Sequence, residues 1–314
     1  MSAAALFKSQ NMAALALHED YLRYVELDGT LSSLKIRRKV QVASGGVAIR
    51  KDSLSDVGAL IPAIENLAGN LGGRFKSPVT LGIPSRDVLI RVMELPKMEI
   101  DDAREALKWD FEKFFPFAFS DAAVDLSMVE NPGNADPSKM SVLVAACRLR
   151  TMESLMRVAE NSGLPLAAIE PLNVAMFRSA LGPVSAYGDG YLAVFAEKDI
   201  TQIVLGYKDN GLVYRTSLLE IPVAEDGNRD FSPLVREIGS TLTFVKNQYR
   251  ELTVETLLLG GSCGKDQRLQ EALESTTGLK ALSMNVWDSW GLTEPEEGSA
   301  GWEAAIGLAV RELL

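Results

Sequence analysis

The sequence is poor in the side chains that most catalytic and metal centres use. Its 314 residues contain one histidine, His18, and two cysteines, Cys147 and Cys263. A Cys/His nucleophilic site needs a histidine beside the thiol, and zinc sites use closely spaced Cys and His pairs. Two isolated thiols also indicate a reducing compartment and not a disulfide framework. The sequence therefore argues against a function based on thiol catalysis or on zinc binding.

Long apolar runs are also missing. No run approaches the roughly 18 apolar residues that a membrane-spanning helix needs. Residues 1–17 contain one lysine and no long apolar region before a small-residue cleavage site, so they do not resemble a signal peptide. From these two features we expect a cytoplasmic protein without a membrane span.

Positive charge is scarce as well. The chain has 42 acidic residues against 32 Lys and Arg, a formal net charge of −10. Binding to nucleic acid needs clustered cations, and the only dense basic run is residues 35–39, which fits a solvated strand face. A basic or amphipathic polypeptide is a better partner for this surface than nucleic acid.

At 314 residues the chain exceeds one ordinary hydrophobic core, so two or more folding units are expected. The most informative stretch is 81–117, with the strand that leads into it. Alternating and β-branched apolar residues predict strands at 79–83 and 88–95. An amphipathic helix follows, and it ends at Phe115-Pro116-Phe117 because proline disfavours a helical residue before it.

One strand pattern occurs twice in the chain. Three short strands with a glycine-bearing turn before the third are predicted at 13–17, 21–27 and 31–42, and again at 191–196, 200–207 and 212–221. Glycine supplies the positive φ that tight turns need. The repetition indicates two lobes built from the same sheet-and-helix pattern, with a last helix from Ser299.

Several motifs resemble the PilM family of type IV pilus assembly proteins. The stretch Glu94-Leu95-Pro96, the helix with Lys-Trp-Asp-Phe-Glu at residues 108–112, and the proline flanked by phenylalanines carry the likeness first. Further similar segments are 23–27, 145–148, 163–165, 169–170, 175–178, 259–261 and 305–309.

This resemblance implies the α/β (α+β) actin-like fold of the cell-division protein FtsA. It has two duplicated sheet-and-helix lobes and an inserted subdomain of the FtsA/PilM type, called 1C. The expected first lobe is residues 1–84 with 171–187 and 299–314. The inserted subdomain is 85–170, and the second lobe is 188–298.

The same resemblance implies that the phosphate motifs have degenerated. Ala16 and His18, and Val194 and Ala196 in the second hairpin, stand where the family pattern has phosphate- and magnesium-side acids and glycines. Side chains at these positions crowd a phosphate, and magnesium loses its oxygen ligands. We expect no ATP hydrolysis, and at most weak binding of ATP with magnesium.

Four residues remain as candidates for nucleotide contact, and no metal ligand or catalytic residue is assigned. They are Glu170, Thr201, Gly260 and Gly261. The run 260–265 fails the spacing of a phosphate-binding loop. An adenine-side turn and a purely structural turn both remain open.

The leading functional hypothesis is a scaffold. PilM-like proteins take up the N-terminal tail of an inner-membrane partner of PilN type, between the first lobe and the inserted subdomain. Candidate contacts are Arg91, Trp109, Phe115, Pro116 and Phe117, for which core packing or surface charge is the alternative. The protein would be peripheral to the inner membrane through its partner, and a homo-oligomer stays open. The alternatives are an active ATPase of the superfamily and a GspL-like secretion component.

Overall fold

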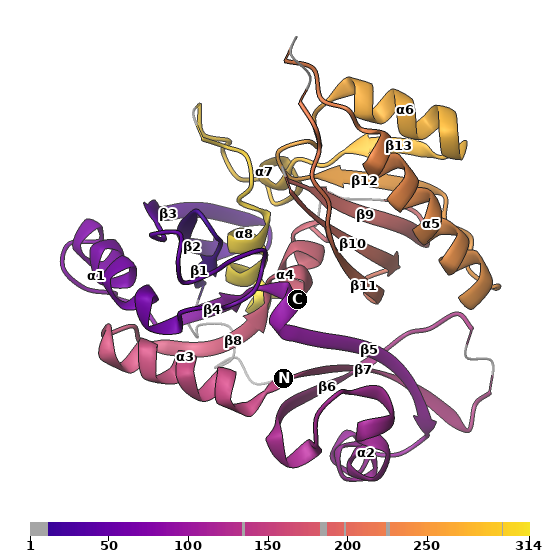
Figure 1. Ribbon diagram of the computed structural model, residues 1–314, viewed down its shortest axis with the longest axis horizontal. Coiled ribbons are helices and arrows are strands. Elements are labelled where there is room, and N and C mark those ends of the chain that lie inside the picture. Colours follow the sequence, from indigo (N-terminus) through magenta and orange to yellow (C-terminus); the bar gives the residue numbers. More distant parts are fainter. Residues whose placement is uncertain (1–11, 134–135, 183–186, 198, 224–226, 297) are drawn as a thin grey trace.

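Figure 1 shows the computed structural model of the chain. The structure describes residues 12–133, 136–182, 187–197, 199–223, 227–296 and 298–314. The prediction that residues 1–17 hold no signal sequence falls largely outside these ranges. Within them, no helix combines the length and the apolar character that crossing a membrane requires.

The first lobe is built on a five-stranded sheet. Its strands are β1 (Ala13–Leu17), β2 (Tyr21–Thr30), β3 (Ser33–Ala43), β4 (Val79–Ile83) and β8 (Leu166–Pro171), in the order β3-β2-β1-β4-β8. The first three strands are antiparallel neighbours, whereas β4 and β8 join in parallel. β1 and β4 are buried along their whole length, which explains their unbroken apolar sequences.

The second lobe repeats this topology strand for strand. Its strands are β9 (Gly190–Ala196), β10 (Ile200–Tyr207), β11 (Asn210–Leu218), β12 (Thr256–Gly260) and β13 (Lys280–Ser283), in the order β11-β10-β9-β12-β13. Helices α5 (Ser232–Gln248) and α6 (Gln267–Thr277) share one hydrophobic core with a face of this sheet. The predicted duplication of the three-stranded pattern is confirmed.

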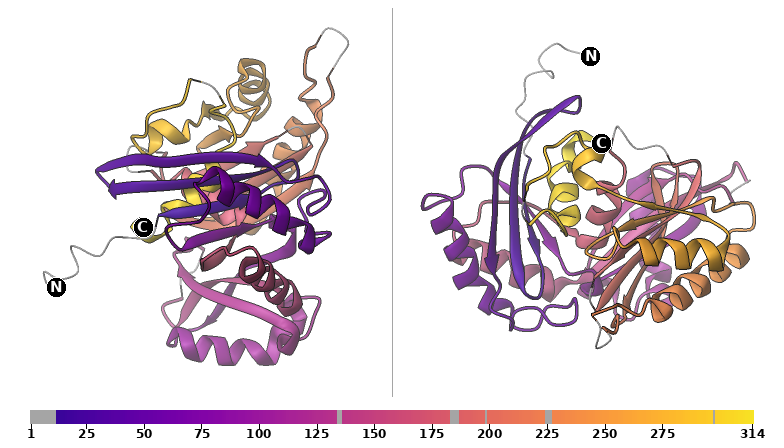
Figure 2. Two further views of the ribbon diagram at one scale, coloured as in Figure 1. Left: turned by 90° about the vertical axis from the view of Figure 1, so that its left-hand side faces the viewer. Right: turned by 90° about the horizontal axis from the view of Figure 1, so that it is seen from above.

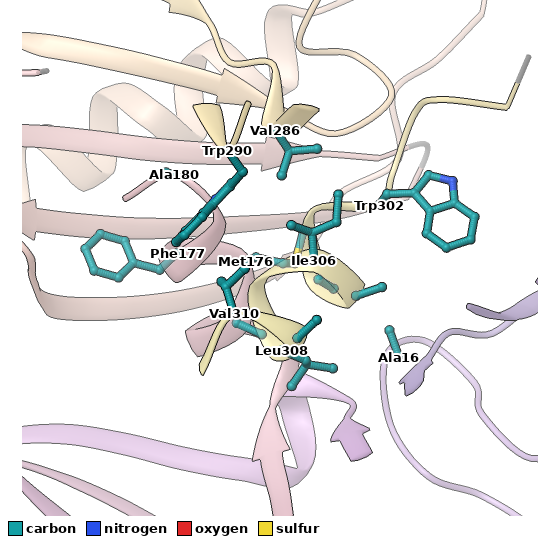
Figure 3. Close-up of a cluster of buried hydrophobic side chains, with 14 of the residues drawn as sticks. Ala16, Met176, Phe177, Ala180, Val286, Trp290, Trp302, Ile306, Leu308 and Val310 are labelled. Carbon is teal, nitrogen blue, oxygen red and sulfur yellow. The ribbon is translucent and has the colours of Figure 1, made fainter. Parts of the chain in front are cut away.

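The two lobes share a central core. Helices α4 (Leu172–Ser179), α7 (Val286–Ser289) and α8 (Glu303–Ala309) contribute to one apolar cluster with residues of both sheets. Figure 2 shows α8 between the two sheets in its right-hand view. Figure 3 shows Met176 of α4 beside Ile306 of α8, with Trp290 next to them. The Trp290 indole N–H donates to the Ser179 carbonyl at 2.9 Å, so this large side chain is buried without a lost hydrogen bond.

A third sheet carries the inserted part. Strands β5 (Val88–Pro96), β6 (Ala122–Val129) and β7 (Lys139–Arg148) lie in the order β5-β7-β6, with α2 (Ile100–Phe114) packed on them. β5, which is the strand predicted at residues 88–95, pairs antiparallel with β7. The Phe111 ring stacks on Phe115 with centroids 4.5 Å apart, so the phenylalanines close a small separate core.

The expected end of the inserted subdomain at residue 170 needs correction. β8 pairs in parallel with β4 of the first sheet, and α3 (Leu149–Asn161) packs in the first lobe's core beside α1 (Leu60–Asn70). The segment after β7 therefore belongs to the first lobe, because its apolar side chains are buried there. The remaining short 3-10 helices are η2 (Val57–Ala59), η3 (Ser85–Asp87), η4 (Phe119–Asp121) and η5 (Arg311–Leu313).

Candidate functional site

The two lobes face each other across a cleft of about 350 Å³. The turn between β1 and β2 and the turn between β9 and β10 both border it, together with the start of α8. Among the described residues that line it there is no Lys or Arg. Six carboxylates line it instead: Glu19, Asp20, Asp52, Glu197, Asp199 and Glu303. None of the six forms an ion pair with another described residue at salt-bridge distance.

The glycine turn after β12 is closed by two of these acids. The Gly261 backbone N–H donates to Glu303 Oε1 at 2.9 Å, and the Ser262 N–H donates to Glu197 Oε1 at 3.3 Å. Backbone N–H groups of such a turn are the donors that bind phosphate in nucleotide sites. Here the chain's own carboxylates occupy them.

The glycines of this turn have a packing reason. A Cβ on Gly260 would lie 2.7 Å from the Phe195 ring, and one on Gly261 would lie 2.6 Å from the Ala196 carbonyl oxygen. Gly261 also has a φ of 77°, a backbone conformation that residues with a side chain rarely adopt. Neither glycine lines the cleft, so the structural reading of the turn is the one that the geometry favours.

Two polar residues near the same cleft have buried polar atoms: the half-buried His18 and the fully buried Thr201. His18 lines it, its Nε2 has no hydrogen-bond partner, and burial together with the nearby Arg23 charge lowers its pKa to about 3. The imidazole is therefore neutral at physiological pH. Thr201 is fully buried on β10, its hydroxyl lacks a partner, and it does not line the cleft.

Glu170, a candidate for nucleotide contact, does not line this cleft. Both of its carboxylate oxygens accept hydrogen bonds from the Arg178 guanidinium, which also donates to the Gly307 carbonyl at 3.0 Å. This ion pair joins β8, α4 and α8. Glu170 is thus a structural residue on the rim of a different depression.

A hydrogen bond between Gln202 and Asp52 crosses the cleft between the lobes. Gln202 Nε2 on β10 donates to Asp52 Oδ2 at 2.8 Å. The Thr216 hydroxyl donates to the Gln202 amide oxygen at 2.6 Å. Asp52 has a positive φ of 56° and is 9% exposed. Burial raises the pKa of Asp52 to about 7, and the hydrogen bond from Gln202 opposes this change.

A larger depression, about 760 Å³, is a groove between the first lobe and the third sheet. It lies beside β6, an edge strand of the third sheet, and β8, the edge strand of the first. Its walls are partly exposed apolar side chains: Ala123, Val124, Leu143, Ala145, Met152, Ile169 and Val174. Charged residues such as Asp125, Arg178 and Arg311 lie among them. We call this depression the apolar groove.

None of the five described residues expected at the partner site lines this groove. Trp109 is 89% exposed on the outer face of α2, and Phe115 is buried in the small core of the third sheet. Phe117 packs beside the Arg148 guanidinium at 5.1 Å, and Pro116 is exposed next to it. Arg91 borders a separate cavity near the end of α5.

The sequence analysis missed the residues that dominate the cleft and the groove. The two hairpin turns offered a signal, because each carries two acids: Glu19 and Asp20 in the first, and Glu197 and Asp199 in the second. The apolar groove had no local signal, since its walls come from segments far apart in the sequence that only the fold brings together.

The duplicated five-stranded sheets, the shared helical core and the cleft between them define a protein of the actin-like fold. The family model described as type IV pilus assembly protein PilM matches residues 17–180. This match covers more than half of the chain, and the chain belongs to that family. No curated protein matches it by sequence.

Solved structures agree on the fold. A chain of a PilM-PilN type IV pilus biogenesis complex is similar with a TM-score of 0.80 and 19% identity, over 98% of this chain and 100% of that chain. A Bacteroides thetaiotaomicron protein with actin-like ATPase fold has a TM-score of 0.52 and 12% identity, over 98% of both chains. The ethanolamine utilization protein EutJ from Carboxydothermus hydrogenoformans has a TM-score of 0.51 and 11% identity, over 97% of this chain and 90% of its own.

Proposed function

We propose that this chain is a cytoplasmic scaffold that binds the N-terminal tail of an inner-membrane PilN-type protein in the apolar groove. The observation that carries the proposal is the groove itself, in a member of the PilM family whose fold matches a chain of a PilM-PilN complex. Through such a partner the chain would be peripheral to the inner membrane.

The chemistry of the groove suits an apolar peptide segment. Its walls present aliphatic side chains that are left partly exposed, and covering them would remove apolar surface from water. The adjacent edge of β6 is already hydrogen-bonded, because the Val124 carbonyl accepts from Arg104 at 2.6 Å and the Leu126 N–H donates to Asp125 at 3.0 Å. We therefore expect side-chain anchors, more than added strand pairing, to carry the affinity.

We infer also that the chain does not hydrolyse ATP. A triphosphate brings up to four negative charges, and the six carboxylates of the cleft would repel them. The two backbone donors of the glycine turn are bonded to Glu303 and Glu197. Among the described residues, no three His, Cys, Asp or Glu side chains are arranged to hold a metal ion. The cleft residues thus do not fit Mg-ATP.

The groove is tested by titrating a synthetic PilN-type N-terminal tail against Met152→Lys. Met152 on α3 lines the groove, and a buried ammonium there would leave an uncompensated charge under the peptide. We expect the affinity to fall at least about tenfold, as for other interface anchors. Fluorescence anisotropy with a labelled peptide measures the dissociation constant.

Met156→Lys is the matched control. It makes the same change one turn further along α3, where Met156 is 57% exposed and outside the groove. Its affinity should equal that of the unchanged protein. Equal weakening by both substitutions, or none by Met152→Lys, would reject the groove as the binding site.

A further inference from the structure

The first lobe carries a basic surface on a chain that is acidic as a whole. Residues 21–43 and 60–78, which form β2, β3, α1 and the loop after α1, contain seven Lys or Arg and three Asp or Glu. The whole chain has 32 Lys and Arg against 42 Asp and Glu. Arg23 and Lys39 of this set pack against the Trp302 ring. The other five cations lie on β3 and in the loop, and the function proposed above does not use them.

The fold brings the middle of β3 against the loop 71–78. The buried Glu26 of β2 links the two segments, because Arg37 Nη1 and the Ser77 hydroxyl both donate to its Oε1, at 3.1 and 3.2 Å. Arg38 Nη1 also donates to the Leu71 carbonyl at 3.4 Å. Cations that are more than 30 residues apart in the sequence therefore share one surface of the first lobe.

We call this set of cations the basic patch: Lys35, Arg37, Arg38, Arg74 and Lys76. Glu26 pairs with Arg37 and Arg38 at 3.1 and 3.8 Å. The other three cations are exposed, and none of them forms an ion pair with another described residue. Asp28 on β2 and Glu65 on α1 are the remaining acids of these segments. The patch therefore keeps a net positive charge.

The β2–β3 hairpin adds an apolar tip beside this charge. β1 pairs with β2 only as far as Glu26, whereas β2 and β3 stay paired as far as Thr30 and Ser33, so the hairpin reaches beyond β1 (Figure 2). Leu31 at its tip is 39% exposed. Residues 1–11, which precede β1, lie outside the described residues and contain one lysine and no acid. Their charge therefore does not oppose that of the patch.

Exposed cations from separate segments, together with an apolar tip, fit an anionic lipid surface. Such a surface attracts each exposed Lys or Arg that comes within about one Debye length, and it is wide enough to reach both segments at once. An aliphatic side chain beside the cations can enter the boundary between head groups and acyl chains. An attachment of this size is weak and reversible, and it is reduced by salt.

We propose that the basic patch and the hairpin tip contact the anionic lipid head groups of a membrane directly. This goes beyond the proposed function, in which a protein partner alone holds the chain at the membrane. The contact needs no partner tail, and the apolar groove takes no part in it. Where a tail also occupies the groove, the lipid contact adds to the attachment, because the second contact then forms within one assembly.

The test is sedimentation of the full chain with vesicles made of equal parts of phosphatidylglycerol and phosphatidylcholine, without any partner peptide. We expect binding that weakens as the salt concentration rises, and no binding to vesicles of phosphatidylcholine alone. Equal binding to both kinds of vesicle, or binding to neither, would overturn the proposal. A glutamate-rich peptide is titrated in parallel. Binding of this peptide without binding to the vesicles would assign the surface to an acidic polypeptide and would also overturn it.

Charge reversal locates the contact. Arg74→Glu with Lys76→Glu changes two exposed cations of the patch, and we expect vesicle binding to weaken at least about tenfold. Lys246→Glu with Arg250→Glu makes the same change in net charge at two exposed positions in the last turn of α5 and just after it, and is the matched control. An equal loss in both variants would show a response to net charge alone and would refute the patch.

A second variant keeps the test independent of the loop. Lys35→Glu changes an exposed cation on β3, and it should weaken vesicle binding in the same direction as the loop variant. Thermal unfolding that is the same in all variants shows that they are folded. Full vesicle binding by a folded Lys35→Glu variant and a folded loop variant would refute the proposal.

Discussion

Single carboxylates set the character of the cleft, and Asp52 is the clearest case. Its backbone has a positive φ, its side chain is buried, and it joins the lobes through Gln202. Its pKa of about 7, against the ordinary 3.8, means that the folded chain holds a proton that the unfolded chain has already lost. Between these two values the contribution of Asp52 to stability falls as the pH rises.

Asp52→Asn should remove this contribution. Asparagine resembles the protonated carboxyl, accepts the same hydrogen bond and tolerates a positive φ. We expect the variant to match the unchanged protein near pH 4 and to become more stable by on the order of 2 kcal/mol at pH 8. Urea unfolding at a series of pH values measures the difference between the two proteins.

The comparison must be made as a difference, because other acids titrate in the same range. Burial also raises the pKa of Asp87, whose charge acts on Asp52, and that of Glu197 across the cleft. Glu197 remains in both proteins and cancels in the subtraction, whereas Asp87 is coupled to Asp52 and its titration contributes to the measured difference. A stability difference that does not change with pH would contradict the assignment to Asp52.

At the scale of elements, α2 divides its aromatic residues between two environments. Phe111 is fully buried against Phe115 and Phe119, whereas Trp109 points into solvent. The helix ends at Phe114 before Phe115-Pro116, as the sequence predicts. Phe111 therefore contributes to the hydrophobic core of the third sheet, whereas the Trp109 ring lies outside that core.

We expect Phe111→Ala to destabilise the chain by about 3–5 kcal/mol, because it leaves a cavity in a small core. Trp109→Ala should change the stability by less than about 0.5 kcal/mol, as for an exposed side chain. It should also leave binding of the PilN-type tail unchanged, since Trp109 lies outside the apolar groove. Denaturant unfolding and the peptide titration check both statements, and a large loss of affinity in Trp109→Ala would move the partner site to α2.

At the scale of the whole molecule, the chain has the two lobes and the cleft of the actin-like fold, and carboxylates line that cleft. The hairpin turns that face it carry acids in both lobes, and α8 adds Glu303. The lobes are tied by a shared helical core and by the hydrogen bond between Gln202 and Asp52. A fold that binds nucleotides elsewhere is compatible here with a different role, because function depends on the site.

Mg-ATP should therefore leave the thermal unfolding of the chain unchanged at millimolar concentration. A ligand at about one hundred times its dissociation constant stabilises a fold by about 2.7 kcal/mol, which such a measurement resolves. Magnesium sulfate at equal ionic strength is the control. Clear stabilisation by micromolar Mg-ATP, with phosphate release above the blank, would favour the active-ATPase alternative.

The sequence by itself determined what depends on local pattern. The period of apolar residues predicted β5, α2 and the three-stranded pattern that occurs in both lobes. These patterns, together with the motifs that resemble the PilM family, were sufficient to predict the fold, because the same strand pattern occurs in both lobes.

Only the tertiary structure decided which side chains meet. Glu170 pairs with Arg178 and not with a ligand, Trp109 faces solvent, and Gly261 donates to Glu303, which lies 42 residues further along the chain. The apolar groove likewise joins β6, β7, α3, β8 and α4. Contacts of this kind depend on how distant segments pack against each other. The spacing of residues along the chain does not predict that packing.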